Sequence, residues 1–220
     1  GQRCMATSVV VLVGASAQWL PDLVEKAKTL KVNAGSEPGT DIGPVVSRVA
    51  KERILGLIEA GVKEGATLAL DGRGIKVPGY EKGNFIGPTI FSGVTTDMEI
   101  YRTEIFGPVL SVVTVPTLDE AIELVNRNPF GNGVGLFTQS GAAARKFQSD
   151  IDIGQVGINI PIPVPVPAFS FTGSRGSKLG DLGPYGKQVV QFYTQTKTVI
   201  ARWFDDATVN DGVNTTISLR

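Results

Sequence analysis

The sequence predicts an α/β fold in which an open, mostly parallel sheet is covered by helices on both faces. Short apolar, β-branched segments alternate along the chain with segments whose apolar residues recur at helical spacing. Strands separated by helices usually form parallel sheets, because each helix carries the chain back across the sheet. The chain has 220 residues, 42% hydrophobic and 19% charged, so it is long enough to bury a sizeable core.

The first third of the chain predicts two strands and two helices. An apolar run typical of a buried strand occupies residues 7–13, and residues 18–30 place apolar side chains on one helical face. After a loop rich in glycine and proline, residues 47–64 predict a second helix with Ser47 as its N-cap. A short strand is expected at residues 67–70. The apolar face expected for the second helix consists of Val49, Ile54, Leu57, Ile58 and Val62.

The same alternation continues beyond a loop-rich middle section. Thr117 is expected to cap a helix and Glu120 to complete a capping box, and this helix should stop before Pro129. The other expected elements are strands at residues 89–91, 109–115, 134–138 and 156–160 and a short helix at residues 140–147.

Three segments near the C-terminus are expected to lie outside this sheet. Alternate prolines from Pro161 to Pro167 exclude a helix or a central strand, so this segment should run extended, as a rigid linker or along a cleft. Residues 189–201 contain a β-rich, alternating stretch that can close an edge of its own sheet or pair with another subunit. The polar residues 205–220 are expected to form a loose tail or to dock on a partner.

The composition excludes several classes of function. Lys plus Arg and Asp plus Glu number 21 each, so no net charge favours nucleic acid or an anionic membrane surface. No apolar run approaches the ~18 residues that a membrane span requires. The chain contains no histidine, which rules out Ser-His, Cys-His and His-metal chemistry built from this chain alone. Its single cysteine forbids an internal disulfide and a multi-thiolate metal site.

That single cysteine, Cys4, is the main candidate for chemistry. It stands beside Arg3 on a glycine-flanked turn that leads into the first predicted strand. A nearby cation favours the thiolate, which is the attacking form of a cysteine. An isolated cysteine is also commonly a small buried residue without chemistry. The residues themselves leave both interpretations open.

Several motifs, in this order, resemble the aldehyde dehydrogenase superfamily. They are Gly-Gln-Arg-Cys at residues 1–4, Asn-Phe-Ile-Gly-Pro-Thr at 84–89, Glu-Ile-Phe-Gly-Pro-Val at 104–109, and the predicted helix at 118–126 that leads into Asn-Pro-Phe-Gly at 128–131. The resemblance extends from Gly1 to about Val199. It implies the α/β catalytic domain of that superfamily for residues 1–187, an oligomerisation strand at 188–201 and a C-terminal tail at 202–220.

Within the superfamily, the chain is most similar to the coenzyme-A-acylating methylmalonate-semialdehyde (malonate-semialdehyde) dehydrogenases. The similarity lies in Arg3, the Gly131–Gly133 turn, the proline-rich segment 160–167 and residues 169–175. Most relatives carry Pro-Phe-Gly-Gly where this chain has Ser-Phe-Thr-Gly at residues 170–173, and that departure favours this subfamily. The resemblance implies NAD as cofactor, coenzyme A as co-substrate and a small semialdehyde as substrate.

The resemblance also assigns roles to five residues. Cys4 would be the nucleophile, and Arg3 would hold the substrate carboxylate instead of an ordinary salt bridge. Glu104 would bind the nicotinamide ribose hydroxyls and Phe106 would pack beside the nicotinamide. Phe171 would line the substrate pocket, with simple core packing as the alternative. Without the resemblance, Glu104 would be interpreted as a solvated loop charge and Phe106 as a core residue.

Two hypotheses of different class follow from what relatives carry upstream of the nucleophile. Their catalytic glutamate, oxyanion-holding asparagine and main NAD-binding domain precede it, so we expect this chain alone to have no dehydrogenase turnover. It is then either the catalytic part of a semialdehyde dehydrogenase that needs the missing N-terminal half, or a non-catalytic domain retained for assembly. The resemblance implies a homo-oligomer, dimer or tetramer, located in the mitochondrial matrix or, alternatively, in a bacterial cytoplasm.

Overall fold

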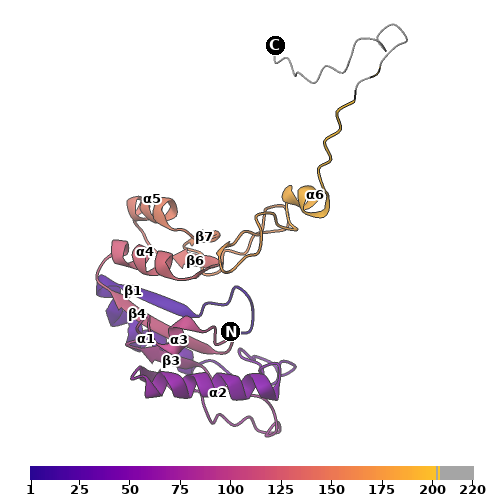
Figure 1. The fold of residues 1–220 in the computed structure, drawn as a ribbon. Helices are drawn as coiled ribbons and strands as arrows, with labels where there is room; N and C mark the ends of the chain where they lie inside the picture. Colours follow the sequence, from indigo (N-terminus) through magenta and orange to yellow (C-terminus); the bar gives the residue numbers. More distant parts are fainter. Residues whose placement is uncertain (202, 204–220) are drawn as a thin grey trace.

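The computed structural model describes residues 1–201 and residue 203, and it confirms an α/β fold dominated by parallel strands (Figure 1). The chain forms two lobes. The main lobe, residues 1–116, contains β1 (Val9–Val13), the 3-10 helix η1 (Gly14–Trp19), α1 (Leu20–Lys28), α2 (Arg48–Lys63), β2 (Thr67–Leu70), β3 (Thr89–Ser92), α3 (Glu99–Arg102) and β4 (Val109–Val115). The small lobe, residues 117–187, contains α4 (Leu118–Arg127), β5 (Phe130–Gly131), β6 (Gly133–Leu136), α5 (Gly141–Asp150), β7 (Gln155–Ile158) and β8 (Ser174–Arg175). Beyond it lies α6 (Gln188–Tyr193).

The main lobe is built on a four-stranded sheet in the order β1-β4-β3-β2. β1, β4 and β3 are parallel, whereas β2 pairs antiparallel with β3, and a β-bulge in β2 shifts the register of this pairing. Helices cover both faces, as the sequence predicts. On one face, Leu12 and Val112 pack with the apolar side of α1. On the other face, Ile54 and Ile58 of α2 pack with Phe91 and with residues of β4.

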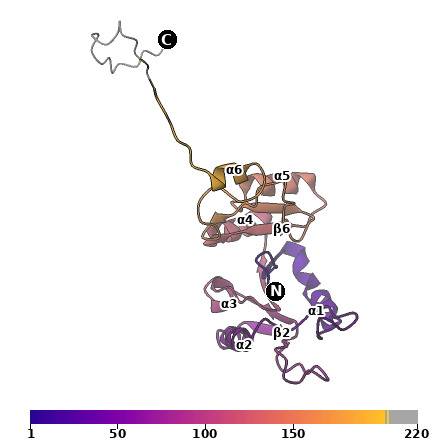
Figure 2. The ribbon, with the colours of Figure 1, turned by 90° about the vertical axis from the view of Figure 1, so that its right-hand side faces the viewer.

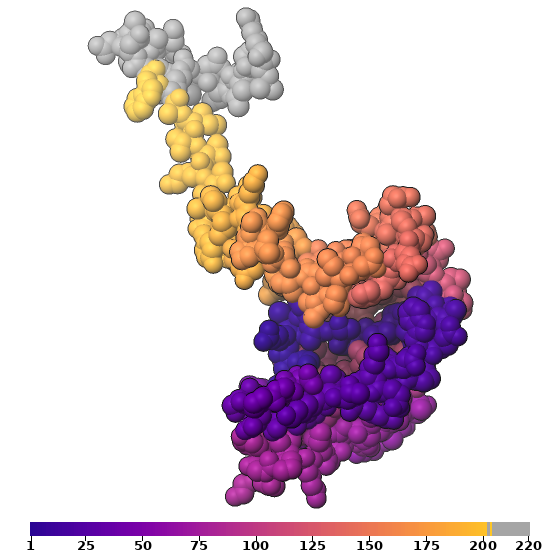
Figure 3. All heavy atoms as spheres, turned by 180° about the vertical axis from the view of Figure 1, so that it is seen from behind, coloured from indigo at the N-terminus to yellow at the C-terminus, as the bar shows by residue number. Residues whose placement is uncertain are grey.

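The small lobe has a sheet and a core of its own. β6 and β7 form a parallel pair, and α4 and α5 cover it through Ile122, Phe147 and Ile151. α4 belongs to both lobes, because Ala121 and Leu124 pack in the main core while other α4 side chains pack in the small one. The space-filling view shows a hollow between the two lobes (Figure 3). The N-terminus lies at the end of the main lobe beside α3 in Figure 1, and on the side of the main lobe that faces the small lobe in Figure 2.

The two predicted helix caps are confirmed. The Ser47 hydroxyl accepts a hydrogen bond from the backbone N–H of Ala50 at 3.1 Å, and the Thr117 hydroxyl accepts one from the N–H of Glu120 at 3.2 Å. The Glu120 carboxylate accepts from the Thr117 hydroxyl at 3.0 Å and not from the Thr117 backbone N–H, so the expected capping box lacks its reciprocal bond. α4 ends before Pro129, as predicted.

One part of the expected apolar face of α2 is wrong. Ile54 and Ile58 are fully buried, but Val49 is 75% exposed and Val62, at the end of the helix, is 41% exposed. Val49 precedes Ile54 by five residues, which places it roughly 140° away around a helix of 3.6 residues per turn. The apolar residue type alone therefore does not put Val49 on the packed face.

The strand expected within residues 188–201 is also wrong in part. Residues 188–193 form the helix α6, and residues 194–201 run without pairing to any strand in the described chain. A strand needs a neighbouring edge to satisfy its N–H and C=O groups, and the described residues offer none here. Pairing with another subunit remains a prediction. The expected tail, residues 202–220, lies outside the described residues except for residue 203.

Candidate active site

Cys4 lies in a turn at the N-terminal entry to β1. The backbone N–H of Ala6 donates to the carbonyl of Arg3 at 3.0 Å, which closes the turn. The Cys4 carbonyl accepts a hydrogen bond from Nδ2 of Asn132 at 2.9 Å. The thiol is free and exposed, and the N–H of Cys4 donates to no acceptor in the described part of the chain. The turn therefore holds the backbone while the thiol and one N–H stay open to a reactant.

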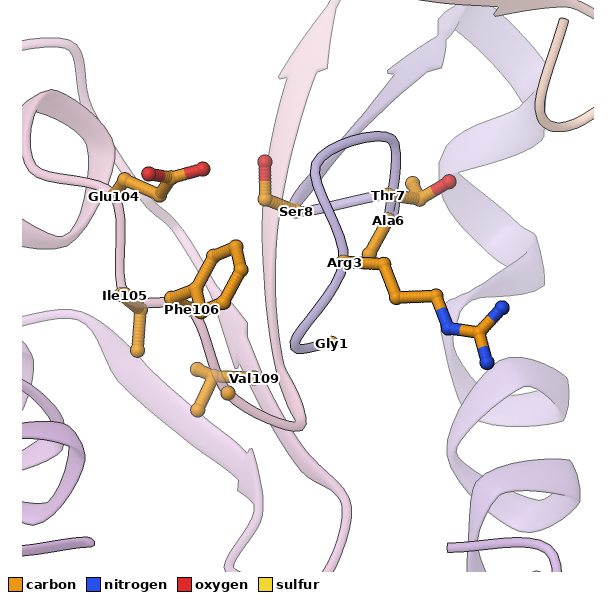
Figure 4. Close-up of a pocket in the computed structure, with 10 residues that line it drawn as sticks. Gly1, Arg3, Ala6, Thr7, Ser8, Glu104, Ile105, Phe106 and Val109 are labelled. Atoms are coloured by element: carbon orange, nitrogen blue, oxygen red, sulfur yellow. The ribbon is translucent and has the colours of Figure 1, made fainter. Parts of the chain in front are cut away.

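Arg3 adds a positive charge to this turn. Its side chain is exposed and forms no ion pair with any described residue. In the close-up, the guanidinium points away from Glu104 and Phe106 (Figure 4). Burial, and then the charge of Arg3, lowers the pKa of the amino group of Gly1. The ordinary salt bridge considered for Arg3 is thus not made within the described residues.

The loop before β4 brings Glu104 and Phe106 to the same area. Ile105 between them is buried in the main core, so its two neighbours project outward. Phe106 has a φ of 55° and is 38% exposed. The left-handed conformation costs a residue with a side chain roughly 1–2 kcal/mol, so the surrounding structure must hold Phe106 in it. Glu104 is exposed at a fixed backbone position.

Arg53 of α2 is a residue that the sequence analysis did not select, and it holds this loop. Its guanidinium donates to the carbonyl of Ile105 at 2.7 Å and also to the carbonyl of Glu104. Gly107 packs directly on α2, because an added Cβ would lie 2.8 Å from Cδ1 of Ile54. The only sequence signal for Arg53 is its place beside a buried helix position, which does not identify the loop it contacts.

The nucleophile turn and the loop before β4 touch each other. A Cβ on Gly1 would lie 1.8 Å from the carbonyl oxygen of Gly107, which shows how closely the two backbones approach. A small hollow lies between them, with Arg3, Ser8, Glu104 and Phe106 among its lining residues (Figure 4). Three of the predicted site residues are therefore brought together here, beside Cys4.

Phe171 is placed differently. It does not line this hollow, and its half-buried ring packs edge-to-face on Tyr185, with ring centroids 6.0 Å apart. Its neighbour Thr172 is linked to the nucleophile turn through two amide side chains that the sequence analysis did not select. Nε2 of Gln155 donates to the Thr172 carbonyl at 2.8 Å and lies 3.4 Å from Oδ1 of Asn132. Core packing and pocket lining both remain open for Phe171.

The described residues contain no group of three or more Cys, Asp or Glu side chains arranged to hold a metal ion. None of their helices has the length and apolar character needed to cross a membrane.

Comparison with known proteins places this geometry in a family. The profile of the Aldehyde dehydrogenase family matches residues 1–199. A mitochondrial methylmalonate-semialdehyde/malonate-semialdehyde dehydrogenase [acylating] of Homo sapiens is 60% identical over 211 residues, covering 96% of this chain and 39% of that protein. A protein of Anopheles gambiae, named a probable enzyme of the same kind, is 66% identical over 203 residues, covering 92% of this chain and 39% of its own length.

Solved structures give the same result. The methylmalonate-semialdehyde dehydrogenase of Oceanimonas doudoroffii superimposes with a TM-score of 0.87 at 44% identity, covering 94% of this chain and 43% of that one. A Sinorhizobium meliloti protein described as the same enzyme, solved in complex with NAD, gives a TM-score of 0.88 at 48% identity, covering 93% and 42%. The chain thus spans about two fifths of the length of the curated relatives it matches, 39% for the human one.

Proposed function

This chain belongs to the aldehyde dehydrogenase family, and from that premise we propose that it is the nucleophile-bearing part of an NAD-dependent, coenzyme-A-acylating methylmalonate/malonate-semialdehyde dehydrogenase. One observation carries the proposal. The exposed Cys4 lies on a turn that touches the loop bearing Glu104 and Phe106, and its neighbour Arg3 lines one hollow together with these two candidate cofactor ligands. The names of the relatives support the substrate and the acylating reaction.

Cys4 performs the first step. Its thiolate adds to the aldehyde carbon, and its backbone N–H stabilises the alkoxide that forms on the carbonyl oxygen. NAD, when bound, accepts the hydride that leaves this carbon. Cys4 then carries an acyl thioester, and the thiol of coenzyme A takes the acyl group and releases the Cys4 thiol. The substrate carboxylate leaves as CO2 and a proton replaces it, which gives propionyl-CoA or acetyl-CoA.

Arg3 serves the substrate in this proposal. A semialdehyde carries a carboxylate close to its aldehyde, and a guanidinium beside the nucleophile can hold it with charge-assisted hydrogen bonds. Arg3 has no ion-pair partner among the described residues, so its charge is available for such an anion. The Arg3 side chain must turn toward the Cys4 thiol to reach the carboxylate of a substrate bound there.

Glu104 and Phe106 serve the cofactor. The exposed Glu104 carboxylate can accept two hydrogen bonds from a ribose diol, and Arg53 holds its backbone in place. Phe106 offers an exposed aromatic ring beside it, suited to packing on a flat heterocycle. Phe171 is assigned to the substrate side, from the loop held by Gln155.

The isolated chain is expected to be incomplete. A single backbone donor supplies only part of an oxyanion hole, and losing one donor of such a hole lowers kcat roughly 100- to 1000-fold in a serine protease. The general base and the main NAD-binding domain are proposed to come from the remaining part of a protein whose relatives are longer; the human one is matched over 39% of its length. We therefore expect no turnover from the 220 residues alone.

The proposal extends to assembly and location. Beyond the small lobe, Val190, Tyr193, Val199 and Ile200 are each at least 66% exposed, so this apolar segment is suited to pack on a second copy. We assign the full-length protein to a dimer or tetramer. In the alternative function, a non-catalytic assembly subunit, the same apolar segment would form the contact with the partner subunit. The relatives' names support a mitochondrial location, with the matrix as the proposed compartment and a bacterial cytoplasm as the alternative.

Thiol labelling tests the nucleophile. Cys4 is the only thiol, so the alkylation rate of the chain at neutral pH reports on this residue alone. We expect faster labelling than for a free cysteine, and protection by malonate semialdehyde that is lost in Arg3→Met. Equal rates for Cys4 and free cysteine, with no protection, would contradict an activated nucleophile in this chain.

Reconstitution tests the reaction. The chain is combined with the N-terminal half of a close relative, and NADH formation from methylmalonate semialdehyde is followed with and without coenzyme A. We expect a CoA-dependent rate that Cys4→Ser abolishes. An NADH rate that does not depend on coenzyme A would overturn the acylating assignment, and no rate at all would favour the assembly subunit.

A further inference from the structure

We propose that Asn132 and Gln155 are positioning residues for the nucleophile, which tie the Cys4 turn to the loop carrying Phe171. The inference rests on the proposed function, because it takes Cys4 as the attacking group. Both amides come from the small lobe: Asn132 lies between β5 and β6, and Gln155 begins β7. Neither touches the reacting thiol, so they would act through the backbone.

Asn132 restrains the backbone of Cys4 directly. Its Nδ2 donates to the Cys4 carbonyl at 2.9 Å, while the Arg3–Ala6 hydrogen bond closes the same turn from within. Fixing this carbonyl fixes the peptide plane that follows Cys4, and with it the direction in which the side chain leaves the backbone. The bond uses neither the thiol nor the N–H of Cys4, so it can position the nucleophile without occupying a reacting group.

Gln155 links Asn132 to the second loop. The side chain is 94% buried, since only 6% of it is exposed, and its NH2 group has two hydrogens to donate. One reaches the Thr172 carbonyl at 2.8 Å and the other is directed at Oδ1 of Asn132 at 3.4 Å. Rotating either amide by 180° would set oxygen against a carbonyl oxygen, so the contacts fix both orientations. Oε1 of Gln155 has no donor among the described residues, so the contacts of Nε2, which also lies 3.7 Å from Sδ of Met5 in the nucleophile turn, orient the amide.

Close packing supports the same link on both sides. A Cβ on Gly133, next to Asn132, would lie 2.4 Å from Cε of Met5. A Cβ on Gly154, next to Gln155, would lie 2.3 Å from Cα of Gly173. The nucleophile turn and the Phe171 loop therefore both rest on the small-lobe backbone, at the positions that flank the two amides.

Hydrogen exchange of the 220-residue chain tests the link without any activity. Asn132→Ala should lower the protection factor of the Ala6 N–H, which closes the nucleophile turn, about tenfold, because the bond from Asn132 to the Cys4 carbonyl is lost. Gln155→Ala should lower it at Ala6 and also at Gly176 and Ser177, the hydrogen-bonded amides that follow the Phe171 loop. The control is Asn126→Ala, which removes a 2.9 Å bond from Nδ2 of Asn126 to the Asp150 carbonyl and a 2.8 Å bond from the Asp152 N–H to Oδ1 of Asn126, and which should leave the Ala6 amide unchanged.

A second Gln155 variant guards against a general loss of folding. Gln155→Glu keeps the side-chain volume but removes both N–H donors, and its neutral carboxyl regains one donor at low pH. Protection of the Gly176 and Ser177 amides, normalised for intrinsic exchange, should therefore return as the pH falls. Protection of β4 should stay constant in every variant. Loss confined to the mutated element, or equal to that of Asn126→Ala, would refute the link.

Steady-state kinetics of the reconstituted protein test the consequence for catalysis. Asn132→Ala should lower kcat about tenfold with the aldehyde KM within about twofold, because it disturbs only the nucleophile. Gln155→Ala should lower kcat and also raise KM, since it releases the Phe171 loop. Unchanged kcat in Asn132→Ala would overturn the positioning role. If the unsubstituted reconstituted protein is inactive while Asn132→Ala and Gln155→Ala change the exchange pattern as expected, the proposed function is refuted. The structural link between the two loops would still stand.

Discussion

The two lobes are stabilised in different ways. In the main lobe, Ile54, Ile58 and Phe91 are completely buried, and the sheet is covered on both faces. The small lobe has a core of three buried residues, Phe147 and two isoleucines, against a two-stranded sheet. Its loops depend more on polar contacts, such as those of Gln155. The candidate site draws on both lobes. The buried Ile105 and Gly107, together with the Arg53 hydrogen bonds, anchor the Glu104–Phe106 loop, whereas the Thr172 loop depends more on the hydrogen bond from Gln155.

Replacing one buried phenylalanine in each lobe should give the largest effect. Phe91→Ala should lower the free energy of unfolding by about 3–5 kcal/mol and weaken the whole chain. Phe147→Ala, with 4% of the original side chain exposed, should lower it by a similar amount but open the small lobe first. Urea titration followed by hydrogen exchange distinguishes the two patterns. A single cooperative transition in both variants would show that the lobes unfold together.

Two arginines allow the same comparison for hydrogen bonds. Arg175, with a φ of 53°, donates to the carbonyls of Asp152 at 2.7 Å and Phe130 at 2.9 Å. Arg175→Met should lower the stability of the small lobe by about 2–3 kcal/mol, since charged donors to two backbone carbonyls are lost. Arg53→Met should cost about 1–2 kcal/mol, because Ile105 and Gly107 still anchor its loop. Denaturation midpoints measure both, and a larger loss for Arg53→Met would contradict the comparison.

Two glycines test how tightly each side is packed. Gly107→Ala should cost about 1–3 kcal/mol, because the new methyl group meets the fully buried Ile54. Gly133→Ala meets only the end of the flexible Met5 side chain and should cost less than about 1 kcal/mol. Its effect should appear in the labelling rate of Cys4 instead. Thermal unfolding and alkylation kinetics of both variants check this, and equal losses of stability would show equally rigid packing.

The smallest effect is expected from surface charge, where the lobes should not differ. A side-chain hydrogen bond from Arg73 holds the pKa of Asp71 below its usual range. The resulting stability is present above the unfolded-state pKa and is lost as the pH falls through the lower folded-state value. Because Asp71 is largely exposed, solvent screening limits this to below about 1 kcal/mol. Asp71→Asn should be slightly less stable than the unsubstituted chain at pH 7, and this difference should shrink at a second pH well below the usual Asp value of about 3.9. A constant difference at both pH values would exclude the ion pair as its cause.

Local signals predicted most of the elements. β4, α2 and α4 have clear periodicity and caps, and Ser47 and Thr117 cap as expected. The errors have two sources. Val49 lies five residues before Ile54, so its helical spacing already places it off the packed face, and its apolar type was misleading. The helix α6 replaces a strand that has no neighbouring edge in the described chain, which the spacing of residues in one segment does not show.

The site divides in the same way. Cys4, Arg3, Glu104 and Phe106 stand in motifs, and the structure brings their loops together. Arg53, Asn132 and Gln155 were not selected, because each acts on a backbone carbonyl remote in sequence. A polar side chain that bonds to a distant main-chain group leaves no local pattern. The sequence marks the Gly131–Gly133 turn only through the family resemblance. The structure gives Gly133 a steric role, because a Cβ at this position would collide with the Met5 side chain.

The helix α4 limits where this chain can be divided. One side of it, with Ala121 and Leu124, completes the main core, and the other side, with Ile122, completes the small one. A gene fragment that ends before α4 would leave the main core uncovered, and one that begins after it would leave the small core uncovered. Expression of either lobe as a separate polypeptide would therefore require the α4 sequence in both, and a circular permutant should place its new termini outside residues 117–128.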